Sequence, residues 1–177
     1  MWSSSRFCQR LNLRQTAALM VWFAVPSAWA HDPGLSSLEI KDHADGVRVE
    51  LRLSARDVAL AVPESDGDGD GVVRADEVSL GNERLRAAVG QWVSITSMAG
   101  GIVVSPLATK VSWNAEDEDI MWQARYEREP GGQWRVDSTQ FAHLPPGHHL
   151  FATAQSETGA TLAEALLRAD KSALVVR

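Results

Sequence analysis

The sequence predicts a mainly β fold, a β-sandwich-like domain with an inserted helix–EF-hand loop–helix segment. Two observations favour the sheets: many short segments alternate apolar and polar residues, and turn residues such as Gly, Pro and Asp separate them. A third observation favours the insertion, because an acidic, glycine-rich segment lies between two stretches with helical spacing. The 177 residues are 45% hydrophobic and 23% charged, which is typical of one globular domain.

The first thirty residues have the pattern of a secretory signal peptide. Arg6, Arg10 and Arg14 precede the apolar run "AALMVWFAV", and the small-residue motif "AWA" ends at Ala30. The apolar run is too short to cross a bilayer as a mature anchor. We therefore expect cleavage after Ala30, which leaves residues 31–177 as a periplasmic or secreted domain without a membrane span. An uncleaved anchor is the alternative.

Charge and cysteine content narrow the classes of partner. The net charge is −6 at pH 7, and cleavage would remove three arginines but no acidic residue. The mature domain would be more acidic still, which disfavours nucleic acid and anionic membranes and favours cations. The one cysteine, Cys8, would leave with the signal peptide, so we expect neither a disulfide nor thiolate chemistry in the mature domain.

The first two strands are predicted to form a hairpin. Segments Leu35–Lys41 and Val47–Ser54 flank the dipeptide Asp45-Gly46, which is a strong hairpin-turn signal. The second segment alternates cleanly, which indicates a strand with one buried face. Its predicted inward residues are Val47, Val49, Leu51 and Leu53.

A helical insertion is predicted at about residues 55–90. Its first helix, Ala55–Val62, follows Ser54, a residue type that favours the N-cap position. Its second helix is predicted over Ala75–Val89, although Gly81 weakens the middle of this helix by about 1 kcal/mol relative to alanine.

The remaining sequence returns to the two-residue period of strands. Val93–Ser97 and Ile102–Ser105 are predicted to form a second hairpin. Ile120–Arg128 is expected to pair with Trp134–Asp137 through the turn "EPGGQ". The other predicted strands are Thr109–Trp113, Leu150–Ala154, Thr161–Leu166 and Ala173–Val176.

The segment "ESDGDGDGVVRADE" matches the EF-hand calcium pattern D-x-[DN]-x-[DN]-G-x₅-E at every required position. Calcium takes six to eight oxygen ligands, and aspartates two residues apart can each supply one as the chain curls around the ion. Gly71, at the sixth position, permits the sharp bend that this curl requires. The predicted ligands are Asp66, Asp68, Asp70, the carbonyl of Val72, and Glu77.

The alternatives at this loop are a solvated acidic turn and a magnesium site. The bidentate twelfth ligand and an extracellular setting favour calcium over magnesium. Arg74 occupies the ninth position, where it cannot bind a cation and should weaken binding. The second acidic run, "NAEDED", lacks the glycine and the spacing of such a site. We expect a structural calcium ion with weak, extracellular-type affinity.

A second metal hypothesis concerns the mature N-terminus. Cleavage after Ala30 would give His31 a free amine beside its imidazole, a pair that chelates copper or nickel. His143, His148 and His149 could add nitrogen ligands. The alternative is that these histidines are ordinary terminal, turn and surface residues.

An enzymatic function is not expected from the motifs present. The sequence contains no G-x-S-x-G elbow, nucleotide-binding glycine motif, HExxH helix or cysteine-based zinc pattern. We therefore expect a binding or interaction protein.

Three further segments support a family resemblance: "AHDPGLSSLEI", "DGDGDGVVRADE" and "LPPGHHLFATAQ" followed by "LAEALLRAD". With them, most of the mature chain resembles the exported N-terminal region of HupE/UreJ-type bacterial membrane proteins, a family associated with hydrogenase and urease accessory functions. In that family the region precedes a bundle of transmembrane helices, and this sequence shows no such segment up to position 177. The resemblance implies an exported calcium-binding module with a membrane protein as partner. It does not by itself imply nickel transport.

Overall fold

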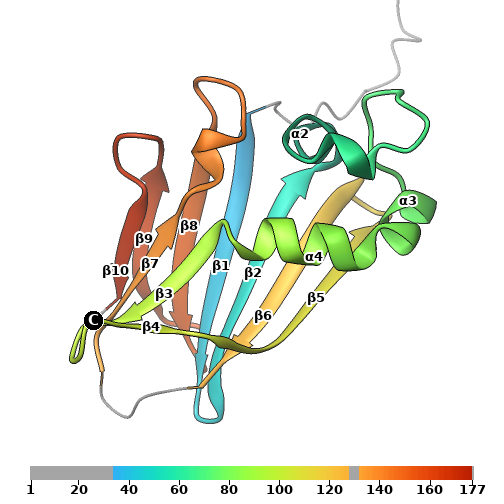
Figure 1. The fold of residues 1–177 in the computed structure, drawn as a ribbon. Helices are drawn as coiled ribbons and strands as arrows, with labels where there is room; N and C mark the ends of the chain where they lie inside the picture. The colour runs from blue at the N-terminus through green and yellow to red at the C-terminus, as the bar shows by residue number, and fades with distance from the viewer. Residues whose placement is uncertain (1–33, 128–131, 177) are drawn as a thin grey trace, which may run out of the picture. The chain divides into compact units, whose positions relative to one another are not determined.

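The computed structural model describes residues 34–127 and 132–176, and its elements are shown in Figure 1. These residues form a mainly β domain with two sheets, which confirms the predicted fold class. Three predictions concern residues outside the described ranges: the signal peptide over residues 1–30, the copper or nickel site at His31, and the centre of the "EPGGQ" turn.

The larger sheet has six strands in the order β5–β6–β2–β1–β8–β9. All neighbours in it are antiparallel except β1 and β8, which run parallel. Its strands are β1 (Leu35–His43), β2 (Gly46–Ser54), β5 (Pro106–Asn114), β6 (Asp119–Tyr126), β8 (His149–Ser156) and β9 (Thr161–Leu167).

The smaller sheet has four antiparallel strands in the order β10–β7–β3–β4. Figure 1 shows this sheet in front of the larger one, beside the long helix α4. Its strands are β3 (Val93–Ser97), β4 (Ile102–Val104), β7 (Trp134–Ser138) and β10 (Ala173–Val176).

The core lies between these layers, where the inward face of each strand is apolar. From Val47 to Leu53 on β2, every second residue is buried and the residues between them are at least partly exposed, as the alternation of the sequence predicts. Both sheets and the helices contribute to one continuous cluster of buried side chains. Its largest fully buried members include Trp122, Leu38, Ile40, Leu51, Leu53, Leu85 and Ile120.

The helical segment runs from Ala55 to Gly90, between β2 and β3. It consists of α2 (Ala55–Ala61), the 3-10 turn η2 (Pro63–Ser65), α3 (Ala75–Leu80) and α4 (Asn82–Gly90). Helices α3 and α4 pack on β5, and α4 also contacts β6. A second 3-10 turn, η3 (Gln140–Ala142), follows β7. Among helices in the described ranges, none is both long and apolar enough to cross a bilayer.

The prediction of one continuous helix over Ala75–Val89 was wrong. The helix ends at Leu80, and a new helix starts at Asn82, with Gly81 between them. The Gly81 N–H still donates to the Glu77 carbonyl at 2.7 Å, but a Cβ at Gly81 would lie only 3.2 Å from that oxygen. Gly81, with φ −95° and ψ 10°, departs from helical geometry, so the helix breaks at its residue of weakest helix propensity.

The predicted pairing of Ile120–Arg128 with Trp134–Asp137 was also wrong. The first segment forms β6, which pairs with β2 and β5, whereas the second forms β7 in the other sheet. Closeness in the sequence favours a hairpin, but both edges of β6 are already hydrogen-bonded, to β2 and to β5. The chain crosses between layers in this region.

The predicted hairpin of β1 and β2 is confirmed, and its turn is tightly enclosed. Gly46 has a φ of 142°, and a Cβ there would lie 2.5 Å from the Tyr126 carbonyl on β6. A side chain would therefore disturb the backbone of two strands.

We predict that Gly46→Ala lowers the free energy of unfolding by about 2–4 kcal/mol, because it combines overpacking with an unfavourable φ. Gly159→Ala is the matched control, since Gly159 also has positive φ but has open space around its Cα. The control should lose only about 1 kcal/mol. Urea denaturation measures both, and equal losses would contradict the steric explanation.

Candidate metal centre

The acidic loop connects η2 to α3, and Asp66 organises its first half. One Asp66 carboxylate oxygen accepts hydrogen bonds from the backbone N–H groups of Gly69 and Asp70, at 2.9 and 3.2 Å. The other oxygen accepts from Gly71 N–H at 2.9 Å. Short acidic side chains readily bind backbone groups a few residues ahead, and here they curl the loop around its own carboxylates.

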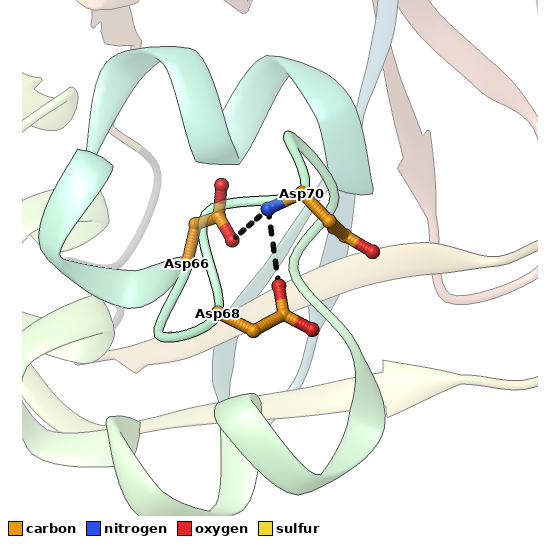
Figure 2. A group of neighbouring side chains, drawn as sticks. All are labelled: Asp66, Asp68 and Asp70. Carbon is orange, nitrogen blue, oxygen red and sulfur yellow. Dashed lines mark hydrogen bonds between the residues drawn. The ribbon is translucent and has the colours of Figure 1, made fainter.

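Asp68 and Asp70 continue the same pattern along the loop. Asp68 accepts from the Asp70 N–H at 3.1 Å, and Asp70 accepts from the Val72 N–H at 2.9 Å. Figure 2 shows the carboxylates of Asp66 and Asp68 approaching the Asp70 backbone nitrogen from two sides. One carboxylate oxygen from each of the three aspartates lies within 4.8 Å of the others. The structure thus brings the three predicted aspartate ligands together.

Gly71 has a φ of 84°, in the left-handed region that the sequence pattern requires at this position. Its N–H points at Asp66, and an added Cβ would meet no neighbouring atom. The glycine is therefore required by backbone conformation and not by lack of space. The bend returns the chain toward the sheet.

Glu77 lies across the loop from the aspartates, in the first turn of α3. One of its carboxylate oxygens accepts from the N–H groups of Gly67 and Asp68, at 2.6 and 3.3 Å. The other accepts from the Arg74 N–H at 2.8 Å, which satisfies a free donor at the start of α3. The twelfth residue of the pattern thus closes the loop through hydrogen bonds to its backbone. Its carboxylate is not part of the group formed by the three aspartates.

Arg74 supplies a positive charge beside the cluster. Its guanidinium forms a close ion pair with the Asp70 carboxylate and lies 3.7 Å from an oxygen of Asp68. The hydrogen bond to Asp70 raises the pKa of Arg74. The guanidinium therefore offsets part of the repulsion among the carboxylates.

The loop is fixed to the core by Val73 and by the start of α2. The Val73 side chain is fully buried, and its N–H donates to the Ala55 carbonyl at 3.2 Å. Ser54 caps α2 by accepting from the Asp57 N–H at 3.1 Å and donating to the Asp57 carboxylate at 2.8 Å. The exposed acidic loop is therefore held at a buried anchor.

Carboxylate oxygens, a backbone carbonyl and water are the ligands that calcium prefers. The half-buried Asp66 and Glu77 and the exposed Asp68 and Asp70 present such oxygens within one loop. The predicted carbonyl ligand belongs to Val72, which is half-buried beside them. Calcium binding itself remains a prediction, as the described geometry is also that of a self-bonded acidic loop.

Among the described residues, no group of three or more possible metal ligands includes a histidine. His143 is exposed and stacks on Trp92, with ring centroids 5.5 Å apart. His148 is buried, whereas the neighbouring His149 is half-buried at the start of β8. Within the described residues, the group of acidic, histidine and cysteine side chains close enough to share a metal ion is the aspartate cluster.

Sequence reasoning missed a buried polar cluster formed by Ser36, His148 and Asp57. The Ser36 hydroxyl and His148 Nε2 are 2.8 Å apart, and His148 Nδ1 lies 3.9 Å from an Asp57 carboxylate oxygen. The second distance exceeds a hydrogen bond. All three residues are at most 4% exposed, so we interpret the cluster as a structural link between β1, α2 and the approach to β8. Its residues are too far apart in sequence to have been found as a motif.

The chain matches no protein-family model and no curated protein.

We predict that acid destabilises the fold through His148. Burial lowers the pKa of His148, Asp57 opposes this effect, and His149 adds to it. Because the pKa in the folded state is below the unfolded value of about 6.5, the unfolded chain takes up this proton first as pH falls. The contribution to stability is complete above pH 6.5 and decreases as the pH falls toward the folded-state pKa.

Urea denaturation of the wild type and of His148→Gln from pH 8 to pH 5 tests this prediction. The variant should show a weaker fall in stability over this range than the wild type. His143→Gln is the control, since His143 is exposed and is not one of the groups that shift the pKa of His148. Parallel curves for the wild type and His148→Gln would refute the prediction.

Proposed function

We propose that the chain is an exported calcium-binding module in which the ion has a structural role. The observation that carries this proposal is the convergence of Asp66, Asp68 and Asp70 within 4.8 Å on a loop whose far side is closed by Glu77. Calcium would replace the repulsion among these groups with direct coordination. Calcium binding would therefore explain why this loop contains so many carboxylates.

The donor set favours a hard divalent cation. The cluster contains oxygen ligands and no sulfur, and soft metals prefer thiolate or thioether groups. The loop presents several carboxylates that are at least partly exposed, which suit the six to eight ligands of calcium better than the strict octahedron of magnesium. Calcium is therefore the better fit.

A structural role fits the anchoring of the loop. Val73 is buried and bonded to Ala55, so movement of the loop would disturb α2 and the core beneath it. A sensor needs a helix pair that opens on binding, whereas α3 and α4 pack on β5. We expect the ion to hold the insertion in place and not to switch it.

The cellular role that we propose is interaction with a membrane partner, as a transporter accessory. The signal-peptide pattern and the resemblance to the exported region of HupE/UreJ-type proteins support this role. Three large apolar side chains within six residues, Ile102, Val103 and Leu107, are each more than 60% exposed. Exposed apolar groups of this kind are often found where proteins interact.

We predict that calcium raises the thermal stability of residues 31–177. With a dissociation constant of about 0.1–1 mM, 10 mM calcium would stabilise the fold by about 1.4–2.7 kcal/mol. Asp66→Asn and Glu77→Gln should reduce this gain strongly, because each removes a charged ligand. The control is Glu164→Gln, an exposed acid on β9, which should retain the full gain.

Thermal melts in 10 mM calcium, 10 mM magnesium and metal-free buffer measure these effects. The proposal requires a larger shift in calcium than in magnesium. No shift in calcium, or an equal shift in wild type and both loop variants, would overturn it.

We also predict that Arg74→Ser strengthens calcium binding. Removal of a positive charge beside the carboxylates should favour a divalent ion by roughly severalfold in affinity at low salt, and by less as salt screens the exposed guanidinium. Arg168→Ser serves as the control, since Arg168 pairs with Asp170 at 2.7 Å and lies outside the loop. Calorimetric titration compares the three proteins, and weaker binding by Arg74→Ser would contradict the competition between guanidinium and metal.

A further inference from the structure

The outer face of the larger sheet carries a row of like charges. Lys41 on β1 lies directly opposite Arg48 on β2, and Arg48 lies directly opposite Arg125 on β6. Cross-strand neighbours of the same charge repel each other at about 5 Å, and such pairs are normally avoided. We call these three residues the cationic row. Because this repulsion lowers the stability of the fold, the row is a candidate for a functional role.

The cationic row lines a groove of about 460 Å³ on this face. A fourth cation, Lys110 on β5, lines the same groove, together with Gln123, its neighbour on β6. The net charge of the whole chain is −6, so this concentration of positive charge runs against the overall composition. The groove is therefore the place where an anion would be favoured.

The two acidic residues of the groove are already engaged by the protein. Glu50 accepts from Arg52 at 2.7 Å and from Gln123 at 2.9 Å, and Glu39 pairs with Lys41 at 3.0 Å. Partial burial opposes ionisation of Glu50, but the hydrogen bonds from Gln123 and Arg52 lower its pKa. Since Arg52 does not line the groove, it neutralises Glu50 from outside. Glu39 offsets the charge of Lys41, so the positive charge offered to an anion comes mainly from Arg48, Arg125 and Lys110.

One end of the cationic row already holds an internal carboxylate. Asp45, in the turn before β2, lies 3.7 Å from Arg48 and 3.3 Å from Arg125. Arg125 also donates to the Asp45 carbonyl at 3.2 Å. Asp45 shows that two adjacent members of the row can share one carboxylate.

We propose that this groove binds a small anion that carries two or more carboxylate or phosphate groups. Strands are about 4.8 Å apart, so the row spans about 10 Å across β1, β2 and β6. A multivalent anion can reach all three strands at once, whereas one carboxylate reaches two adjacent members, as Asp45 does. Arginine favours both carboxylate and phosphate through its planar fork of donors. The site is independent of the calcium loop.

Calorimetric titration with tripolyphosphate and with citrate tests the proposal and separates the two anion chemistries. The protein is wild-type residues 31–177 in metal-free buffer, so that chelation of calcium contributes nothing. At least one probe should bind with one-to-one stoichiometry and weaken as salt is added. Binding of tripolyphosphate alone would assign the site to phosphates, and binding of citrate alone to carboxylates.

Arg48→Gln should weaken binding at least about tenfold, since it removes the central member of the row. Arg135→Gln is the matched control: it makes the same charge change on β7, where Arg135 pairs with Asp137. The control should bind within about twofold of the wild type. Equal weakening in both variants, or no binding of either probe by the wild type, would overturn the proposal.

A second measurement does not depend on the folding of a variant. Amide NMR shifts of the wild type on titration should change at residues 39–41, 48–50 and 123–125. Changes confined to other parts of the domain would place the anion elsewhere and overturn the proposal.

Discussion

The domain depends on the double pairing of β1, which is antiparallel to β2 on one side and parallel to β8 on the other. A parallel neighbour cannot be reached through a tight turn, so a long crossover must connect the two strands. Here that crossover contains the whole insertion, the smaller sheet apart from β10, and the other half of the larger sheet. The pairing of β1 with β8 closes this long connection and places Ser36 within hydrogen-bonding distance of His148. A buried polar link then reinforces the junction at which the two ends of the fold meet.

Short-range features of the fold could be predicted from the sequence, because they depend on neighbouring residues. The hairpin turn at Gly46 and the helix start at Ser54 were found in this way, and the alternation on β2 identified its buried face. Long-range pairing could not be predicted, since residues far apart in sequence give no local signal. The partners of β6 and β7 were missed for this reason. The break at Gly81 was underestimated, because a propensity penalty does not show where a helix must turn to pack.

The acidic loop was the most predictable part of the candidate site, since all its residues lie in one short segment. Asp66, Asp68 and Asp70 converge as their spacing indicates, and the positive φ of Gly71 was also expected. The sequence did not reveal that Glu77 binds backbone amides across the loop. The cationic row was missed entirely, because its members come from three strands and become neighbours only through their register. Charge patterns along a single strand cannot show such a row.

The hydrogen bond from Val73 to Ala55 has a consequence for how metal would load. If the central N–H of such a loop had no partner, it could form a hydrogen bond with a second loop. Metal binding to one loop would then change the affinity of the other. Here the Val73 N–H donates to the Ala55 carbonyl of the same chain, and the Val73 side chain is buried. Each molecule would therefore fill as an isolated unit, and its saturation curve would be a simple hyperbola with a Hill coefficient of about one.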